Sequence, residues 1–63
     1  MTQLEILELA YDACAERWAT ARESVDKAIE EGRHNSIALH REAQYKEKLE
    51  ELYELINIAR KAQ

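Results

Sequence analysis

The sequence predicts an all-α fold, an antiparallel hairpin of two long amphipathic helices that pairs with a second copy into a four-helix bundle. The composition is helical, with no proline and one glycine among 63 residues. Apolar residues recur at alternating steps of three and four along both halves of the chain. The single glycine lies near the middle, where a hairpin needs its turn. We therefore expect one domain over residues 1–63.

The first helix is expected over about residues 3–31. Thr2 followed by Glu5 matches the T-x-x-E capping box, in which the hydroxyl and the carboxylate each satisfy a free backbone N–H of the first turn. Nothing interrupts the helical periodicity from there to Gly32. The apolar seam of this helix consists of Leu4, Leu7, Tyr11, Cys14, Trp18, Ala21, Val25 and Ala28.

The turn is expected over residues 32–35. Gly32 adopts the left-handed conformation that ends many helices at low steric cost, and Asn35 or Ser36 offers a side-chain oxygen to cap the next helix. A connection this short makes the two helices antiparallel neighbours. The second helix is then expected over about residues 36–61, where Arg60 and Lys61 suit the negative end of its dipole.

The seam of the second helix matches that of the first. It consists of Ala38, Tyr45, Leu49, Leu52, Ile56 and Ala59, with Glu42 at the one missing place. Folding the chain about its turn brings residues whose numbers add to about 67 to the same level, which sets seam against seam. The resulting neighbours include Leu7 with Ala59, Tyr11 with Ile56, Cys14 with Leu52, Trp18 with Leu49, and Ala21 with Tyr45.

The prediction of self-association follows from the small size of the chain. A domain of 63 residues is marginally stable without a further restraint, and Cys14 is the only cysteine, so no intrachain disulfide supplies one. A lone hairpin shields only one side of Tyr11, Trp18 and Tyr45 and forfeits about 1.5–3 kcal/mol for each large side chain left in water. We expect a homodimer, with a tetramer and both orientations of pairing left open. Its predicted core is Leu7, Tyr11, Cys14, Trp18, Tyr45, Leu49, Leu52 and Ile56.

The plan of the chain resembles that of ROP-type dimeric helical hairpins. The resemblance covers the length, the two helices, the tight turn and the heptad seams, and it is an analogy of architecture without an aligned motif. It implies a four-helix bundle of two copies. ROP-type proteins bind RNA through a face that bears basic residues and an aromatic, and no residue of that face is carried over to this sequence.

A second set of apolar residues stands off the seam at the end of the hairpin where the termini meet. This predicted partner patch consists of Ile6, Leu9, Leu55 and Ile58. A helix that is apolar over much of its circumference is usually buried on more than one side. The patch therefore indicates either a broad dimer interface or a docking surface for another protein.

Basic residues gather in and before the first half of the second helix, and they are the best argument for nucleic-acid binding. The candidate contacts are Arg33, Arg41, Lys46 and Lys48. Glutamates are interleaved with them, and the net charge of −4 gives no general attraction to a polyanion. We therefore expect nucleic acid not to be the partner.

Two polar positions of the seam have alternative interpretations. Glu42 is expected to reach the bundle edge and meet Arg22 or Arg41, unless it serves as a polar seam residue that fixes the register. Cys14 is expected to be a small buried apolar residue, the alternative being a redox link to the same residue of a second copy.

The sequence favours a non-enzymatic interaction protein, an adaptor or regulator that presents helical faces to a protein partner. It contains no glycine-rich phosphate loop and no nucleophile with a base, and His34 and His40 lack further ligands at metal-binding spacing. We expect no cofactor and no metal. A regulatory nucleic-acid binder and a structural subunit of a larger assembly are the alternatives.

The expected compartment is the cytoplasm. No stretch approaches the roughly 20 apolar residues of a membrane span, so we expect no membrane association. The amino-terminal residues lack the basic and apolar regions of a signal peptide, and a lone cysteine suits a reducing environment.

Overall fold

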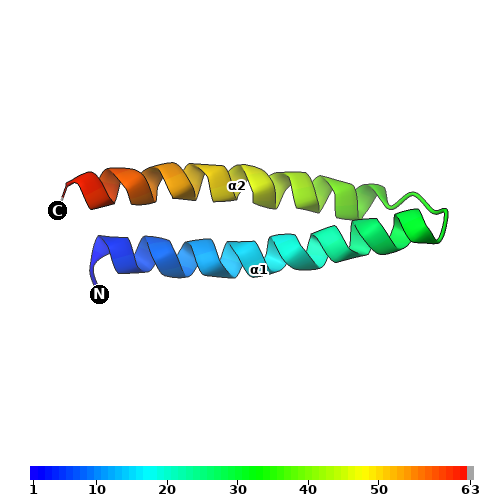
Figure 1. Ribbon diagram of the computed structural model, residues 1–63, viewed down its shortest axis with the longest axis horizontal. Coiled ribbons are helices and arrows are strands. Elements are labelled where there is room, and N and C mark those ends of the chain that lie inside the picture. Colours follow the sequence, from blue (N-terminus) through cyan, green and yellow to red (C-terminus); the bar gives the residue numbers. More distant parts are fainter. Residues whose placement is uncertain (63) are drawn as a thin grey trace.

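The computed structural model describes residues 1–62 as a helical hairpin (Figure 1). Helix α1 spans Gln3–Glu30 and helix α2 spans Ser36–Lys61, and the two pack against each other in antiparallel directions. The hairpin is a rod with extents of 49 × 16 × 14 Å, and the start of α1 and the end of α2 lie at the end opposite the turn. The predicted all-helical hairpin is confirmed, with α1 ending one residue before the expected position.

Both helices begin with a side-chain cap. The Thr2 Oγ1 atom accepts a hydrogen bond from the Glu5 backbone N–H at 3.2 Å, and the Asn35 Oδ1 atom accepts one from the Ala38 N–H at 3.0 Å. The expected capping box forms only in part, because the Glu5 carboxylate accepts from the Thr2 hydroxyl instead of the Thr2 backbone N–H. Both groups are exposed, so water can satisfy the remaining donor.

The turn depends on the left-handed conformation of Gly32, whose φ is +70°. Its N–H donates to the Ile29 carbonyl at 3.0 Å, and the Arg33 N–H donates to the Ala28 carbonyl at 2.7 Å. This pair of bonds is the Schellman motif, which satisfies two carbonyls that the end of α1 would otherwise leave free. The predicted role of the glycine is thus confirmed by the backbone.

Replacing Gly32 with alanine is expected to lower the free energy of unfolding by about 1 kcal/mol, the cost of holding a Cβ-bearing residue at positive φ. No atom lies within 4 Å of the added Cβ, so the loss comes from the backbone alone. Urea denaturation measures the effect, with Glu30→Ala as the control at the last residue of α1, where the backbone is helical. Equal midpoints for the two variants would contradict this account of the turn.

The buried core of the hairpin is small and lies mainly near the turn. Four of its five side chains come from the half of the rod that contains the turn, and three of them are alanines. The buried residues are Ala21, Val25, Ala28, Ala38 and Ile56. Over residues 1–62 no large side chain is fully buried. The helices therefore pack on small side chains near the turn, and the larger side chains of the seam lie farther along the rod.

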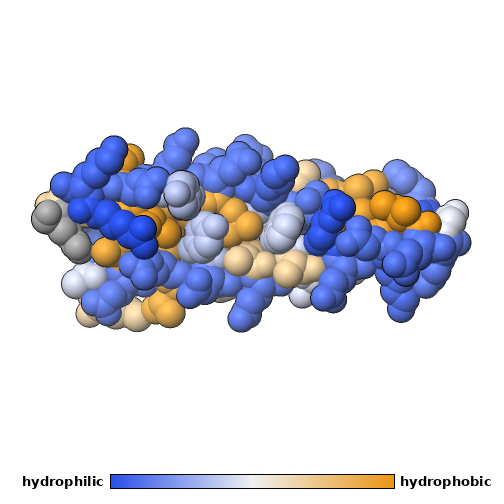
Figure 2. Space-filling view, viewed as in Figure 1, coloured by the Kyte–Doolittle hydropathy of each residue, from blue (hydrophilic) through white to orange (hydrophobic). Residues whose placement is uncertain are grey.

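Most of the predicted dimer core is half-buried in the single hairpin. Ile56 is buried, while the other seven members remain in partial contact with solvent: Leu7, Tyr11, Cys14, Trp18, Tyr45, Leu49 and Leu52. Figure 2 shows the corresponding surface, in which hydrophobic areas lie along the boundary between the helices and near the turn, bordered by hydrophilic side chains. The hairpin thus leaves much of its seam in contact with water.

Candidate interaction surfaces

The two broad sides of the hairpin differ in chemistry. Shallow hollows on one side are lined by Tyr11, Trp18, Leu49 and Tyr53, which we call the aromatic face. Hollows on the other side are lined by Arg17, Arg41, Tyr45 and Lys48, which we call the basic face, and Glu16 is the one acidic residue that lines them. The two sets of hollows share no residue. Successive helical positions are 100° apart, so the seam residue Trp18 lies toward the aromatic face and its neighbour Arg17 lies toward the basic face.

The aromatic face follows the predicted register. Trp18 and Leu49 line one hollow together, and Tyr11 and Ile56 line the next. Tyr11 and Tyr53 belong to both hollows, which makes the aromatic surface continuous. Charged side chains of both signs border it, namely Glu8, Asp12, Lys46, Glu50, Glu54 and Arg60. A surface with an apolar centre and a mixed charged rim is typical of a protein interface.

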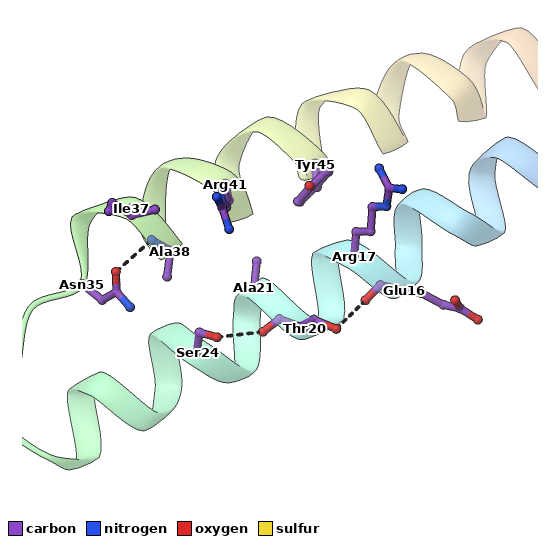
Figure 3. A pocket seen from close by; sticks show the side chains of 10 residues that line it. All are labelled: Glu16, Arg17, Thr20, Ala21, Ser24, Asn35, Ile37, Ala38, Arg41 and Tyr45. Atoms are coloured by element: carbon purple, nitrogen blue, oxygen red, sulfur yellow. Dashed lines mark hydrogen bonds between the residues drawn. The ribbon is translucent and has the colours of Figure 1, made fainter.

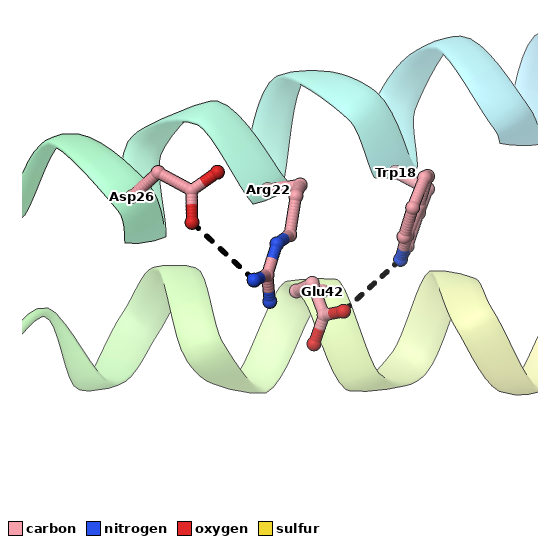
Figure 4. A network of polar contacts seen from close by, with 4 residues as sticks. All are labelled: Trp18, Arg22, Asp26 and Glu42. Atoms are coloured by element: carbon pink, nitrogen blue, oxygen red, sulfur yellow. Dashed lines mark hydrogen bonds and ion pairs between the residues drawn. The ribbon is translucent and has the colours of Figure 1, made fainter.

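Glu42 binds the indole of Trp18 (Figure 4). The Trp18 Nε1–H donates to the Glu42 Oε1 atom at 3.1 Å, and both residues are half-buried. The expected contact with Arg22 or Arg41 is replaced, because Arg22 pairs with Asp26 at 3.4 Å on its own helix. The bond gives the break in the apolar seam a structural explanation, since it satisfies an indole donor that the seam half-covers.

The bond to Trp18 predicts a difference between two substitutions of Glu42. Glutamine keeps an acceptor oxygen at the same place, so Glu42→Gln is expected to leave the free energy of unfolding within about 0.5 kcal/mol of the parent. Glu42→Met has similar length but no acceptor, and it is expected to cost about 1 kcal/mol. Urea denaturation followed by Trp18 fluorescence measures both. A Met variant at least as stable as the Gln variant would rule out a stabilising role for this bond.

The basic face is centred on Tyr45. Figure 3 shows Arg17 extending from α1, and Arg41 and Tyr45 from α2, into the space between the helices. Lys48 lines the adjoining hollow, which Arg17 and Tyr45 share. Within residues 1–62 the ion pairs are Arg22 with Asp26 and Arg33 with Glu31, so these three cations have no carboxylate partner in the hairpin. The basic face therefore carries a local positive charge on an acidic chain.

The four basic residues predicted as possible nucleic-acid contacts do not lie on one surface of the hairpin. Arg41 and Lys48 lie on the basic face, while Lys46 lines the aromatic face. Arg33 is bound at the turn by the Glu31 carboxylate. Sequence reasoning missed Arg17, which belongs to the basic face from the other helix. Its position directly before the seam residue Trp18 was the available signal.

The predicted partner patch consists of side chains that the single hairpin leaves exposed. Ile6, Leu9, Leu55 and Ile58 are all exposed. On α1 the steps from Ile6 through Ala10 and Ala13 lead to Arg17, and on α2 Leu55 lies one heptad from Lys48. The patch therefore extends the basic face toward the termini.

Exposed apolar side chains also surround the turn, and sequence reasoning did not single them out. Ile29 and Leu39 share a hollow with the buried residues Val25 and Ala28, and Ile37 lies on the basic face. Ile29 follows the seam residue Ala28, and Leu39 follows Ala38, so each stands just outside the seam. Their apolar character next to the seam is the signal that was available.

Cys14 is a free thiol and half-buried. Its Sγ–H donates to the Tyr45 carbonyl at 3.5 Å, and it lines a hollow of the basic face with Leu52, its predicted neighbour.

No three side chains among residues 1–62 converge as metal ligands. Neither helix, over the part of the chain that the structure describes, contains a stretch both long and apolar enough to cross a bilayer.

No protein-family model, curated protein or solved structure matches this chain.

Proposed function

We propose that this protein is a self-associating interaction module, an adaptor or regulator in which two hairpins pair into a four-helix bundle and hold another protein on their outer surface. One observation supports self-association above the rest. Among residues 1–62 the only buried side chains larger than alanine are Val25 and Ile56, while Tyr11, Trp18 and Tyr45 stay half-buried and Tyr53 is 56% exposed. A second copy would remove these side chains from water.

The energies involved favour pairing. A domain of this length has a total stability of about 3–9 kcal/mol, at roughly 0.05–0.15 kcal/mol per residue. Complete burial of a large apolar side chain is worth about 1.5–3 kcal/mol, so covering the remaining half of four aromatic side chains gains about 3–6 kcal/mol per hairpin, which is comparable to the whole stability. The free energy gained when a second copy covers the seam is therefore large relative to the stability of so small a chain.

Sedimentation equilibrium together with thermal unfolding tests self-association. We expect a dimeric mass at micromolar concentration and a melting temperature that rises with protein concentration, because mass action couples folding to pairing. A folded monomer whose melting temperature is independent of concentration would overturn the proposal.

The basic face and the partner patch provide the surface for the other protein. Arg17, Arg41 and Lys48 lack carboxylate partners in the hairpin, and exposed apolar side chains continue the same side toward the termini. This arrangement suits an amphipathic helix with acidic residues beside an apolar stripe, because apolar anchors supply affinity and complementary charge supplies specificity.

The partner surface is tested with the double variant Leu9→Glu, Ile58→Glu. Both residues are exposed, so we expect a change in the free energy of unfolding within about 0.5 kcal/mol per site and an unchanged dimer, measured by urea denaturation and sedimentation. Affinity capture with the parent protein is expected to recover a partner that this variant loses. Loss of the fold or of the dimer would assign the patch to self-association instead.

A charge-reversal variant separates a protein partner from nucleic acid. Arg17→Glu with Lys48→Glu is expected to reduce capture of the partner by the basic face, and nuclease treatment is expected to leave the remaining capture unchanged. If the captured material disappears on nuclease treatment and its binding weakens steeply with salt, the nucleic-acid alternative replaces the protein partner.

A further inference from the structure

We infer that the second copy packs on the aromatic face, with the two turns at the same end of the bundle. This inference rests on the proposed self-association and adds the surface and the orientation. Three observations carry it: the charge of the basic face, the exposure of Ile29 and Leu39 beside the turn, and the order of residues along the outer edge of each helix.

The basic face is a poor surface for pairing with itself. Its central cations, Arg17 and Lys48, lie at nearly the same level and share a hollow with Tyr45. Two copies joined through this face would bring Arg17, Arg41 and Lys48 of each chain together, and Glu16 is the one carboxylate per copy that lines the same hollows. Like charges in an interface disfavour that arrangement. The aromatic face instead has an apolar centre and a rim of both signs.

Residues seven apart return to the same side of a helix, so each helix presents one row along the edge of the aromatic face. On α1 this edge row is Glu8, Ala15, Arg22 and Ile29. On α2 the edge row, read from the terminal end toward the turn, is Arg60, Tyr53, Lys46 and Leu39. Glu8 and Arg60 share a hollow near the termini, and Ile29 and Leu39 share one near the turn, so the two rows run level.

With both turns at the same end, the edge row of α1 lies on the edge row of α2 of the second copy. Glu8 then meets Arg60 of the second copy, which pairs opposite charges. Ala15 meets the second copy's Tyr53, which sets a small residue against a large one. Ile29 meets the second copy's Leu39, so these exposed side chains cover each other.

One level of this arrangement brings like charges together, because Arg22 meets Lys46 of the second copy. Each of these cations has acidic neighbours in its own chain. Arg22 pairs with Asp26 at 3.4 Å, and Lys46 lies four residues from both Glu42 and Glu50. Their repulsion is thereby reduced.

The opposite orientation closes the face less well. It places each α1 on the α1 of the second copy, and each α2 on α2, with directions reversed. In the register centred on Ala15 and Tyr53, Glu8 then meets Arg22, but Lys46 meets Arg60, so the charges give no advantage over the first arrangement, and Leu39 lies beyond the end of the facing helix. In the register shifted by half a heptad, Ile29 meets Glu8 and Leu39 meets Arg60, so neither apolar side chain finds an apolar neighbour. Pairing with the turns together is therefore favoured by the apolar side chains near the turn.

A spin label at the turn measures the orientation. The variant His34→Cys, with Cys14→Ala to remove the native thiol, carries one label at an exposed position of each chain. With the turns together, double electron–electron resonance is expected to give about 20–30 Å between the two spin labels. Packed helix layers are only about 10 Å apart, and the label side chains add to this separation. With the turns at opposite ends, the distance approaches the 49 Å length of the rod. A label at Lys61→Cys provides the same measurement at the other end.

The outcomes separate this inference from the proposed function. Short distances at both ends support the inference. A dimer by sedimentation with long distances at both ends overturns the orientation and leaves self-association standing. A monomer overturns both.

The choice of face has its own test near the turn. Ile29 and Ile37 are 66% and 67% exposed and lie on opposite faces, which makes them a matched pair. Ile29→Glu is expected to raise the dimer dissociation constant at least tenfold, while Ile37→Glu leaves it within about twofold. The reverse result would assign the dimer to the basic face.

Discussion

Replacing Tyr53 with glutamate is expected to raise the dissociation constant of the dimer by at least about 100-fold, which corresponds to roughly 2.7 kcal/mol. Tyr53 is 56% exposed in the single hairpin and is one of the two middle residues of the edge row of α2. The substitution removes a large aromatic contact at two symmetric places and puts two carboxylates into an apolar surface, where a charge has no compensating partner. Sedimentation equilibrium over a concentration series measures the change.

The matched control for this prediction is Ile58→Glu. Ile58 lies on the same helix, is 64% exposed and belongs to the partner patch on the opposite side. Its variant is expected to keep the dissociation constant within about twofold of the parent. Because Tyr53 is so exposed, its glutamate variant should also keep the helical circular dichroism of a folded hairpin at concentrations where the parent is paired. Equal dissociation constants for the parent and Tyr53→Glu would exclude the aromatic face as the dimer interface.

Replacing Ile56 with alanine is expected to lower the free energy of unfolding by about 3 kcal/mol, within the range of roughly 2–5 kcal/mol measured for such deletions in cores. Ile56 is 5% exposed and is the largest of the buried side chains among residues 1–62. Its loss leaves a cavity beside Tyr11 and Tyr53, with which it shares a hollow. Because the chain has a total stability of about 3–9 kcal/mol, the variant should approach the unfolding threshold at room temperature.

The control for this prediction is Ile58→Ala, which removes the same atoms two positions along the helix. Ile58 is exposed, and alanine favours the helix more than isoleucine does, so a change within about 0.5 kcal/mol is expected. Urea denaturation at a fixed protein concentration measures both variants. If Ile58→Ala lowers the free energy of unfolding as much as Ile56→Ala does, then exposure in the single hairpin does not determine the stability of the folded protein, and this prediction is wrong.

The helices and the turn were predictable because their determinants are local. Thr2, Gly32 and Asn35 each act through backbone groups within a few residues, so residue type and spacing were sufficient. The position of the turn predicted which seam residues lie opposite each other across the hairpin. Trp18 shares a hollow with Leu49, and Cys14 shares one with Leu52, as expected. Periodicity specifies which residues face the other helix, and the turn specifies where along it they lie.

The composition of the two faces was harder to predict, because it depends on which side of the seam each residue occupies. The sequence analysis grouped Lys46 with Arg41 and Lys48 since they are close along the chain, whereas the helix sends Lys46 to the other face. The same reasoning overlooked Arg17, which is distant in sequence and adjacent in space. Charge alone suggested an arginine partner for Glu42, whereas in the structure its carboxylate accepts a hydrogen bond from the indole N–H of Trp18.

Most of the buried side chains lie near Gly32, and this location affects the order in which the hairpin folds. Contacts around the turn join residues close in sequence, so their formation costs little loop entropy and should precede the rest of folding. The helices would then associate progressively from the turn toward the termini, where the seam is least covered. Backbone amides of Val25 and Ala28 should accordingly exchange with deuterium more slowly than those near Leu7 when the protein is dilute, and the difference should narrow as the protein concentration rises.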